Sequence, residues 1–310
     1  TRSRYDQYLA SGWFRGSVML YKMDLLCIDA NVFSVVNIRL DLQNYAAKKR
    51  HRKIKKQVEQ RFNITYGVAK VTPEKQRLYE QHKSRFKGFI HETLEEYLYA
   101  GFHSTVFETM EICVYDDDRL IATSFFDLGE RSMASLLAVY DSHYKSFSLG
   151  TYTMLKEIEF GQQTGRKLYY PGYVLDLPSR FDYKLELGEM EYYTPSKRWG
   201  KLANFNRKDT FAHALRERMS TLKEALKTDG IRFKIGSTPI SAWVTCLCGK
   251  DDSSTCLGSL NWAMIWTEHS LLVFVQKKKN SCCAMLSHVR MNNISSIWSR
   301  PTNSAIKPST

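Results

Sequence analysis

The spacing of apolar residues in the middle of the chain predicts three strands, a helix and a fourth strand. Residues 107–115, 119–129 and 132–141 are rich in β-branched and aromatic residues, and the acidic turn DDD between the first two predicts a hairpin. Residues 151–161 place apolar side chains on one helical face, and residues 167–175 predict the fourth strand. The predicted order is strand, strand, strand, glycine-containing loop, helix, strand.

The flanking segments differ in character from this central part. Residues 1–45 contain short stretches of β-branched and aromatic residues, which predict short strands and turns. Thr72 can cap a helix that has Pro73 in its first position, and residues 92–102 predict a second helix. Residues 200–230 predict one more helix, and the tail that follows mixes short strands with most of the cysteines.

A basic helix is predicted over residues 46–61. Eight lysines and arginines accompany one glutamate in this stretch, which gives a net charge of +7. Ile54, Val58 and Phe62 recur at every fourth position, so one stripe docks on the core and the rest is charged. Like charges at this spacing destabilise a helix, and a bound polyanion relieves that repulsion. The stretch therefore predicts RNA contact, with a solvated helix face as the alternative; the residues assigned to tRNA are Lys48, Lys49, Arg50, Arg52 and Lys53.

The overall charge points in the same direction. The chain of 310 residues has 45 lysines and arginines against 32 acidic residues, a formal net charge of +13. This excess suits RNA as a partner, although a generally basic protein has the same composition. No apolar run approaches the ~20 residues that a membrane helix needs. We expect a cytoplasmic protein with no membrane association.

The cysteine pattern predicts neither a disulfide framework nor a metal site. The chain has seven cysteines, an odd number, and only Cys27 and Cys113 lie outside the tail. Zinc sites usually space their ligands in two C-x(2–4)-C pairs, whereas the tail combines C-x-C with adjacent cysteines. Buried or free thiols are the preferred interpretation of this tail set, which comprises Cys246, Cys248, Cys256, Cys282 and Cys283.

The loop before the central helix is a candidate anion site. In the stretch SFSLGTYTMLKEIEF, Gly150 lies among hydroxyl residues at the predicted start of the helix. Unpaired N–H groups at a helix start favour anions. The element order resembles the acyltransferase superfamily of the N-acetyltransferases, in which a glycine-rich loop binds the pyrophosphate of acetyl-CoA. A plain turn is the alternative, because this chain offers one glycine only.

A set of motifs gives this loop its context. Together they resemble the arginyl-tRNA–protein transferase family, which includes the bacterial aminoacyl-tRNA–protein transferases. The resemblance covers roughly residues 6–200. The motifs that carry it are SFSLGTYTMLKEIEF, YYPGYVLDLPSRFDYKLELGEMEYY, LIATSFFDLG, LYEQHKSRFKGF and LASGWFRGSVMLY.

The resemblance implies a fold and an activity. The implied fold is α/β (α+β), with an N-acetyltransferase-like mixed sheet, flanking helices and an N-terminal mixed domain. The implied reaction moves an amino acid, with arginine expected, from charged tRNA to the N-terminal amine of proteins with an acidic first residue, which marks them for degradation. Aminoacyl-tRNA is then a co-substrate, and no other cofactor and no metal are expected.

The resemblance also assigns roles to residues. An aminoacyl ester is already activated, so the enzyme has to position an amine and stabilise an oxyanion. Catalytic roles fall on Asp127, Ser148, Tyr173 and Tyr183. The tRNA 3′ end is assigned to Ser148, Leu149, Gly150 and Thr151, and acceptor binding to Lys184, Arg85 and His82. The alternatives are core aromatics for the tyrosines, a surface lysine for Lys184 and a structural histidine for His82.

The chain departs from the family pattern at several positions. Many relatives carry an N-terminal Cys-x-x-Cys and a later Cys-Cys pair, whereas the N-terminal region of this chain has only Cys27, so no cluster is expected there. Relatives tend to have cysteine, lysine and methionine where this chain has Pro178, Arg180 and Phe181, and Leu137 replaces a common tyrosine. These changes concern the donor amino acid more than the reaction class.

Two other functions stay open on this evidence. One is a CoA-dependent N-acyltransferase, against which the single loop glycine and the basic charge count. The other is a non-catalytic tRNA-binding protein, which binds charged and uncharged tRNA alike. The predicted domains are residues 1–70 (an N-terminal transferase domain with the basic helix), 71–200 (the acetyltransferase-like catalytic domain) and 201–310 (a C-terminal helix with a small β extension).

Overall fold

The computed structural model describes residues 1–28, 31–84, 91–102 and 106–228. The chain divides into two compact units, and residues 1–218 fall in the first. The fold is described below for this first unit. Arg85, the tail cysteines and the proposed β extension beyond residue 228 lie outside the described residues.

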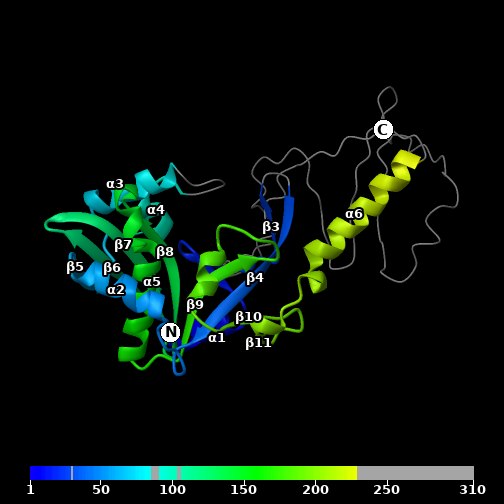
Figure 1. The fold of residues 1–310 in the computed structure, drawn as a ribbon. Helices are drawn as coiled ribbons and strands as arrows, with labels where there is room; N and C mark the ends of the chain where they lie inside the picture. The colour runs from blue at the N-terminus through cyan, green and yellow to red at the C-terminus, as the bar shows by residue number, and fades with distance from the viewer. Residues whose placement is uncertain (29–30, 85–90, 103–105, 229–310) are drawn as a thin grey trace, which may run out of the picture. The chain divides into compact units, whose positions relative to one another are not determined.

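A large mixed sheet forms the centre of the described part (Figure 1). The nine strands run in the order β11-β10-β4-β9-β8-β7-β6-β5, with β3 paired to β4. A separate hairpin consists of β1 and β2. The strand bounds are β1 Phe14–Gly16, β2 Met19–Tyr21, β3 Leu25–Ile28, β4 Asn31–Asp41, β5 Asn63–Val68, β6 Thr109–Asp116, β7 Arg119–Leu128, β8 Ser132–Tyr140, β9 Leu168–Leu175, β10 Met190–Tyr193 and β11 Trp199–Lys201.

Helices cover both faces of this sheet. On one face, α2 and α5 pack against Ile112, Val114 and Phe126; on the other, α3 and α4 pack against Cys113 and Phe125. Neighbouring strand residues point to opposite faces, so the two layers are separated by the sheet. The helix bounds are α1 Arg2–Ala10, α2 Lys49–Glu59, α3 Pro73–Lys83, α4 Leu94–Tyr99, α5 Leu149–Gln163 and α6 Phe211–Thr228; the short 3₁₀ turns are η1 Ser142–Phe147, η2 Asp182–Glu186, η3 Leu202–Asn204 and η4 Arg207–Asp209.

The expected fold class, a mixed sheet with flanking helices, is confirmed. The central order β6, β7, β8, loop, α5, β9 is also the predicted one. The apolar stripe of the basic helix is buried at Ile54 and Val58, and Thr72 caps α3 by accepting the Lys75 N–H. These elements follow from local spacing and capping, which the sequence carries directly.

The N-terminal segment differs from the prediction of short strands and turns. It begins with helix α1, which Thr1 caps and which buries Tyr5 and Leu9, four residues apart. It also supplies the eleven-residue strand β4, which lies between β10 and β9 in the middle of the sheet. The strands β5, β10 and β11 are additional to the prediction; β10 and β11 are short, and β5 and β10 pair with strands distant in the sequence.

A search of the described helices for a membrane span was negative. None of them combines the length and the apolar character needed to cross a bilayer.

Candidate functional site

The sheet opens between β8 and β9. These two strands are parallel and pair over three residues only, from Ser132 opposite Leu168 to Ala134 opposite Tyr170. Beyond that point β8 continues beside β7, and β9 continues beside β4. We call residues 135–140 of β8 and 171–175 of β9 the strand split.

Two bulges coincide with the start of the strand split. In β8, Leu136 is the extra residue between the pairs that β7 makes with Ser135 and Leu137. In β9, two residues, Tyr170 and Pro171, stand opposite one residue of β4. A bulge bends its strand, and Pro171 has no N–H to continue a ladder. The buried stretch 132–134 accordingly gives way to half-buried residues at 135–138.

Side chains satisfy backbone carbonyls on both edges of the strand split. The Tyr97 hydroxyl donates to the Leu136 carbonyl at 3.0 Å, and the Lys184 ammonium donates to the Tyr173 carbonyl at 3.2 Å. Buried carbonyls need partners, and these two strand edges find them in side chains from α4 and η2 rather than in each other.

Aromatic rings surround the β9 edge. The Tyr173 ring lies 5.4 Å from that of Phe14 and 5.2 Å from that of Phe181, while Phe14 also contacts Tyr21. The Lys184 Nζ lies 5.4 Å from the ring centres of both Tyr173 and Phe181. The hairpin β1–β2, the end of β9 and η2 therefore meet at this point.

Lys184 is a cation without an anionic partner in the described structure. Its contacts there are one carbonyl and two ring faces, with no carboxylate among them. Burial lowers the pKa of Lys184 to about 8. Gly172, with φ +97°, leaves the space next to the ammonium open, because a Cβ at that position would lie 3.2 Å from the Nζ. The predicted glycine-tyrosine and tyrosine-lysine pairs are thus brought together.

The predicted anion loop forms the start of α5. Ser148 adopts a left-handed conformation, with φ 54° and ψ 43°, between η1 and α5. Ser148, Gly150 and Thr151 are half-buried, whereas the Leu149 side chain is in the core. A Cβ on Gly150 would lie 3.5 Å from the Tyr140 ring at the far end of β8, which is ordinary contact. Gly150 is therefore not required for packing.

Tyr183 is exposed and lies within electrostatic range of the buried carboxyl group of Glu157. Its side chain is 46% exposed, yet burial of part of the side chain, the Glu157 charge and Tyr140 raise its pKa to about 12. Glu157 of α5 is fully buried and accepts the Tyr169 hydroxyl at 2.7 Å, while its second oxygen, Oε1, has no partner among the described residues. Burial raises the pKa of Glu157 from 4.5 to about 7, although the hydrogen bond from Tyr169 favours the ionised form.

The raised pKa of Glu157 predicts a pH-dependent stability. The folded state holds this proton up to about pH 7 and the unfolded state only to about 4.5, so stability falls as the pH rises between these values. Glu157→Gln should therefore raise the free energy of unfolding at pH 8 by up to about 3 kcal/mol and change it little at pH 4.5. Urea unfolding at the two pH values measures this difference.

Glu159 provides the matched control on the same helix. Burial acts to raise its pKa, but hydrogen bonds from Lys55 and Lys156 outweigh that effect and the pKa is lowered. Glu159→Gln should accordingly cost stability above pH 4.5 rather than add to it. If both variants respond to pH in the same direction, Glu157 is not buried as described.

Asp127 lies in the protein interior rather than at the strand split. Its carboxylate pairs with Arg15 at 2.6 Å and also accepts the Thr109 and Tyr5 hydroxyls. Both members of the pair are at most 1% exposed. Burial raises the pKa of Asp127, and Arg15 opposes that rise. The structure therefore does not present this carboxylate to a substrate, and its predicted catalytic role rests on the sequence resemblance.

The basic helix α2 contacts η2, which holds Tyr183 and Lys184, at one end and η1, which precedes Ser148, at the other. At its N-terminal end, Lys48 donates to the Glu186 carbonyl of η2 at 2.8 Å, and Arg50 forms an ion pair with the Glu186 side chain. At the other end, Phe62 packs against Tyr144 and Phe147 of η1. A surface hollow of about 580 Å³ follows the helix; its lining residues are Lys49, Arg50, Arg52, Lys53 and Lys56.

The predicted acceptor residue His82 is not brought into this arrangement. His82 is a half-buried residue of α3, which packs on the sheet face opposite to α5. Arg85 lies outside the described residues. Of the three predicted acceptor-binding residues, the structure therefore places Lys184 beside the predicted tyrosines.

Sequence reasoning missed the partners of the predicted residues. Glu157, Tyr97 and Arg15 were not singled out, although Tyr97 contacts the strand split, Arg15 contacts Asp127 and Glu157 accepts the hydroxyl of Tyr169, two residues before the split. Glu157 carried a usable signal, because a carboxylate next to Ile158 falls on the apolar side of the predicted helix. Tyr97 and Arg15 carried none, since their partners are 39 and 112 residues away.

Known proteins resemble the chain in sequence. Residues 73–194 match the family model described as arginine-tRNA-protein transferase, C terminus. The aspartate/glutamate leucyltransferase of Leptospira interrogans is 25% identical over 206 residues, which cover 64% of this chain and 76% of the relative. The protein of the same name from Aeromonas hydrophila is 23% identical over 196 residues, 59% of this chain and 75% of the relative.

Solved structures give more distant matches. L-PGS from Bacillus licheniformis aligns with a TM-score of 0.35 at 14% identity over 55% of this chain, which spans about half of that structure (49%). FemX aligns with a TM-score of 0.38 at 9% identity, over 57% of this chain and 61% of that one. The sequence matches confirm the resemblance predicted from the motifs: residues 73–194 are similar to the C-terminal part of the arginine-tRNA-protein transferase family, and the curated relatives are named aspartate/glutamate leucyltransferases.

Proposed function

We propose that this protein moves an aminoacyl group from charged tRNA to the α-amine of proteins with an acidic first residue, in the cytoplasm. The observation that carries the proposal is Lys184, a half-buried ammonium beside the strand split with no carboxylate among its described contacts. The side chain of an N-terminal Asp or Glu supplies the missing counter-ion. The names of the curated relatives support the same acceptor.

The reaction needs positioning rather than an enzyme nucleophile. The neutral α-amine attacks the ester carbonyl carbon, the new C–N bond forms, the bond to the ribose oxygen breaks, and the amine proton passes to that oxygen. An α-amine has a pKa of ~7.7–8.0, so its neutral form is available near neutral pH. The first N–H groups of α5, from Leu149 to Thr151, are the donors for the oxyanion or the 3′ end.

The tRNA body is assigned to helix α2. Its exposed charges are cationic except for Glu59, which pairs with Lys156, and its two ends contact the segments that hold Tyr183 and Ser148. Phosphate contacts fix the register of a nucleic acid, while the single-stranded 3′ end is recognised by stacking and polar groups. Tyr173 and Tyr183 are the candidates for that second role.

For the donor amino acid we propose leucine over the arginine that the motifs alone suggest. The curated relatives are named leucyltransferases. A buried guanidinium needs a carboxylate partner. Two carboxylates next to the strand split already pair with arginines, Asp176 with Arg216 and Glu186 with Arg50, and burial raises the pKa of the third, Glu157, to about 7. Arginine stays the alternative that the assay separates.

A transfer assay tests the proposal. Purified protein is mixed with radiolabelled Leu-tRNA or Arg-tRNA and with peptides that begin with Asp, Glu or Ala. Label that moves from Leu-tRNA to acidic peptides alone is the expected result. Transfer from Arg-tRNA only would overturn the donor assignment, and labelling from acetyl-CoA with no tRNA affinity would favour a CoA-dependent acyltransferase.

The salt dependence of tRNA binding tests helix α2. Three of its exposed cations, Lys49, Arg52 and Lys53, have no acidic partner among the described ion pairs. Replacing all three with glutamine should weaken tRNA binding and reduce the slope of log K against log[salt] by about 2–3. Binding measured between 50 and 200 mM salt gives this slope.

A triple variant of equal charge change serves as the control. Lys197, Lys201 and Lys208 are also exposed but belong to other elements. Their replacement with glutamine should leave the slope within about 1 of the unmodified protein. Equal slopes in the two triple variants would remove α2 from the interface.

A further inference from the structure

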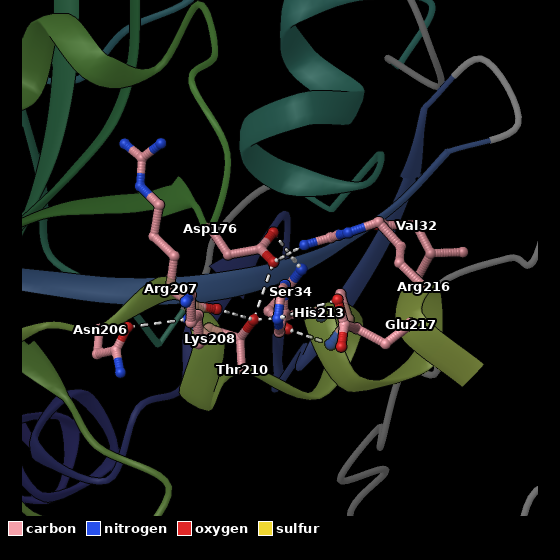
Figure 2. A network of polar contacts seen from close by, with 11 residues as sticks. Val32, Ser34, Asp176, Asn206, Arg207, Lys208, Thr210, His213, Arg216 and Glu217 are labelled. Atoms are coloured by element: carbon pink, nitrogen blue, oxygen red, sulfur yellow. Dashed lines mark hydrogen bonds and ion pairs between the residues drawn. The ribbon is translucent and has the colours of Figure 1, made fainter. Parts of the chain in front are cut away.

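Asp176 is a fully buried carboxylate at the end of the strand split. It directly follows Leu175, the last residue of β9. Its oxygens accept the Ser34 N–H at 2.9 Å, the Thr210 hydroxyl at 2.9 Å and the Arg216 guanidinium at 2.6 Å (Figure 2). Three donors from β4 and from the region around the start of α6 thus converge on one acid.

We call Asp176, Thr210 and Arg216 the junction. Two further hydrogen bonds stabilise it. The Ser34 hydroxyl accepts the Ala212 N–H at 2.9 Å, and the second guanidinium nitrogen of Arg216 donates to the Val32 carbonyl at 2.7 Å. Because each group has a partner, the junction carries its buried charge without an orphaned donor or acceptor. The first residues of α6 are thereby hydrogen-bonded to β4 as well as to the Asp176 carboxylate.

Apolar contacts connect this junction with the loop that carries Tyr183 and Lys184. Phe181 and Leu185 pack against the buried cluster of Val36, Ile38 and Val174. Leu202 and Phe205, which precede α6, pack against the same cluster. Residues 202–216 therefore hold the loop 176–189 at two points, the Asp176 carboxylate at its start and the apolar cluster around its middle. All of these bracing residues lie C-terminal to the matched region 73–194.

We propose that the junction of Asp176, Thr210 and Arg216 positions the Tyr183–Lys184 loop for acceptor binding, an inference that rests on the function proposed above. Asp176 is a positioning residue in this role, because it touches no substrate. Loss of the guanidinium leaves a buried carboxylate short of a donor, and the loop start then has to rearrange toward water. The C-terminal residues up to 216 are accordingly part of the acceptor site.

Hydrogen exchange of the full-length protein tests the structural half of the proposal. In Arg216→Ala, the amides of residues 179–189 should lose protection by about tenfold or more, while those of β6 and β7 keep theirs. Arg216→Lys should restore part of the protection, because lysine keeps the positive charge but cannot bond to both Asp176 and Val32 as the two guanidinium nitrogens do. Uniform loss over the sheet, or loss confined to α6, would overturn the positioning role.

Kinetics test the functional half. Arg216→Ala should raise KM for an acidic acceptor peptide about tenfold and leave Kd for aminoacyl-tRNA within about twofold. Arg207→Ala is the matched control, because this exposed arginine points away from Asp176 (Figure 2); it should change neither value. Parallel changes in KM and Kd would overturn the proposal. If the unmodified protein transfers nothing while Arg216→Ala still loses protection in the loop alone, that result would overturn the proposed function but support the positioning of the loop by the junction.

Discussion

Lys184→Met should abolish the preference for acidic acceptors and leave the protein folded. The unmodified protein should use a peptide that begins with Asp about 10²-fold better than one that begins with Asn, because a carboxylate that meets a half-buried cation gains several kcal/mol of discrimination. The variant should use both peptides at the lower rate. The ratio of kcat/KM for the two peptides measures this effect directly.

The pH profile gives a second measure of the same residue. Lys184 is charged below its pKa of about 8, whereas the acceptor amine reacts in its neutral form, above a pKa of ~7.7–8.0. For the Asp peptide, kcat/KM should rise with pH and fall again above about 8. In Lys184→Met the fall on the alkaline side should disappear, because the group that loses its charge is absent.

Stability separates this role from a structural one. The folded state gives up the Lys184 proton at lower pH than the unfolded chain, so this residue adds stability above its ordinary pKa near 10.5 and loses that contribution as the pH falls through about 8. Lys184→Met should therefore be at least as stable as the unmodified protein at pH 7. Lys22, which also contacts one carbonyl and one ring, is the matched control; Lys22→Met should keep the acceptor preference.

Asp127→Ala should destabilise the fold severely. It leaves the Arg15 guanidinium buried without its carboxylate, which costs about 3–5 kcal/mol for pairs of this kind. Domains are stable by about 5–15 kcal/mol in total, so the variant should unfold at much lower urea concentration. Arg15 also holds the β1–β2 hairpin against α4 through the Leu98 carbonyl, and that attachment should be lost as well.

Two further variants show whether the effect comes from the buried pair. Replacing Arg15 with methionine and Asp127 with leucine together should cost less than Asp127→Ala alone, because no orphaned charge remains. Glu108→Ala, which breaks an exposed pair with Arg2, should cost less than about 1 kcal/mol. An Asp127→Ala protein that is stable yet inactive would instead support the catalytic role predicted from the resemblance.

Local patterns made part of this fold predictable. Ile54 and Val58 repeat at helical spacing and Thr72 precedes Pro73, so α2 and the start of α3 follow from a few neighbouring residues. The strand split does not follow in this way. It depends on where β9 leaves β8 and joins β4, and the register between β4 and β9 is set by residues more than one hundred positions apart.

The candidate site shows the same division. The pairs Gly172–Tyr173 and Tyr183–Lys184 could be selected from motifs, but the lack of a carboxylate next to Lys184 is visible only in three dimensions. Asp127 illustrates the opposite case. Its sequence context is a strand end that resembles a family motif, and its partner Arg15 is 112 residues away. The sequence could not distinguish an acid that meets substrate from one that meets a buried guanidinium.

The central position of β4 has a consequence for how this chain can be divided. This strand joins the sheet between β10 and β9, although it lies far N-terminal to the matched region. A fragment restricted to residues 73–194 would expose the hydrogen-bonding edges of β9 and β10 together with apolar residues such as Val174. Open edges of this kind recruit strands from other molecules. The homologous segment, cut out alone, should aggregate rather than behave as an independent catalytic domain.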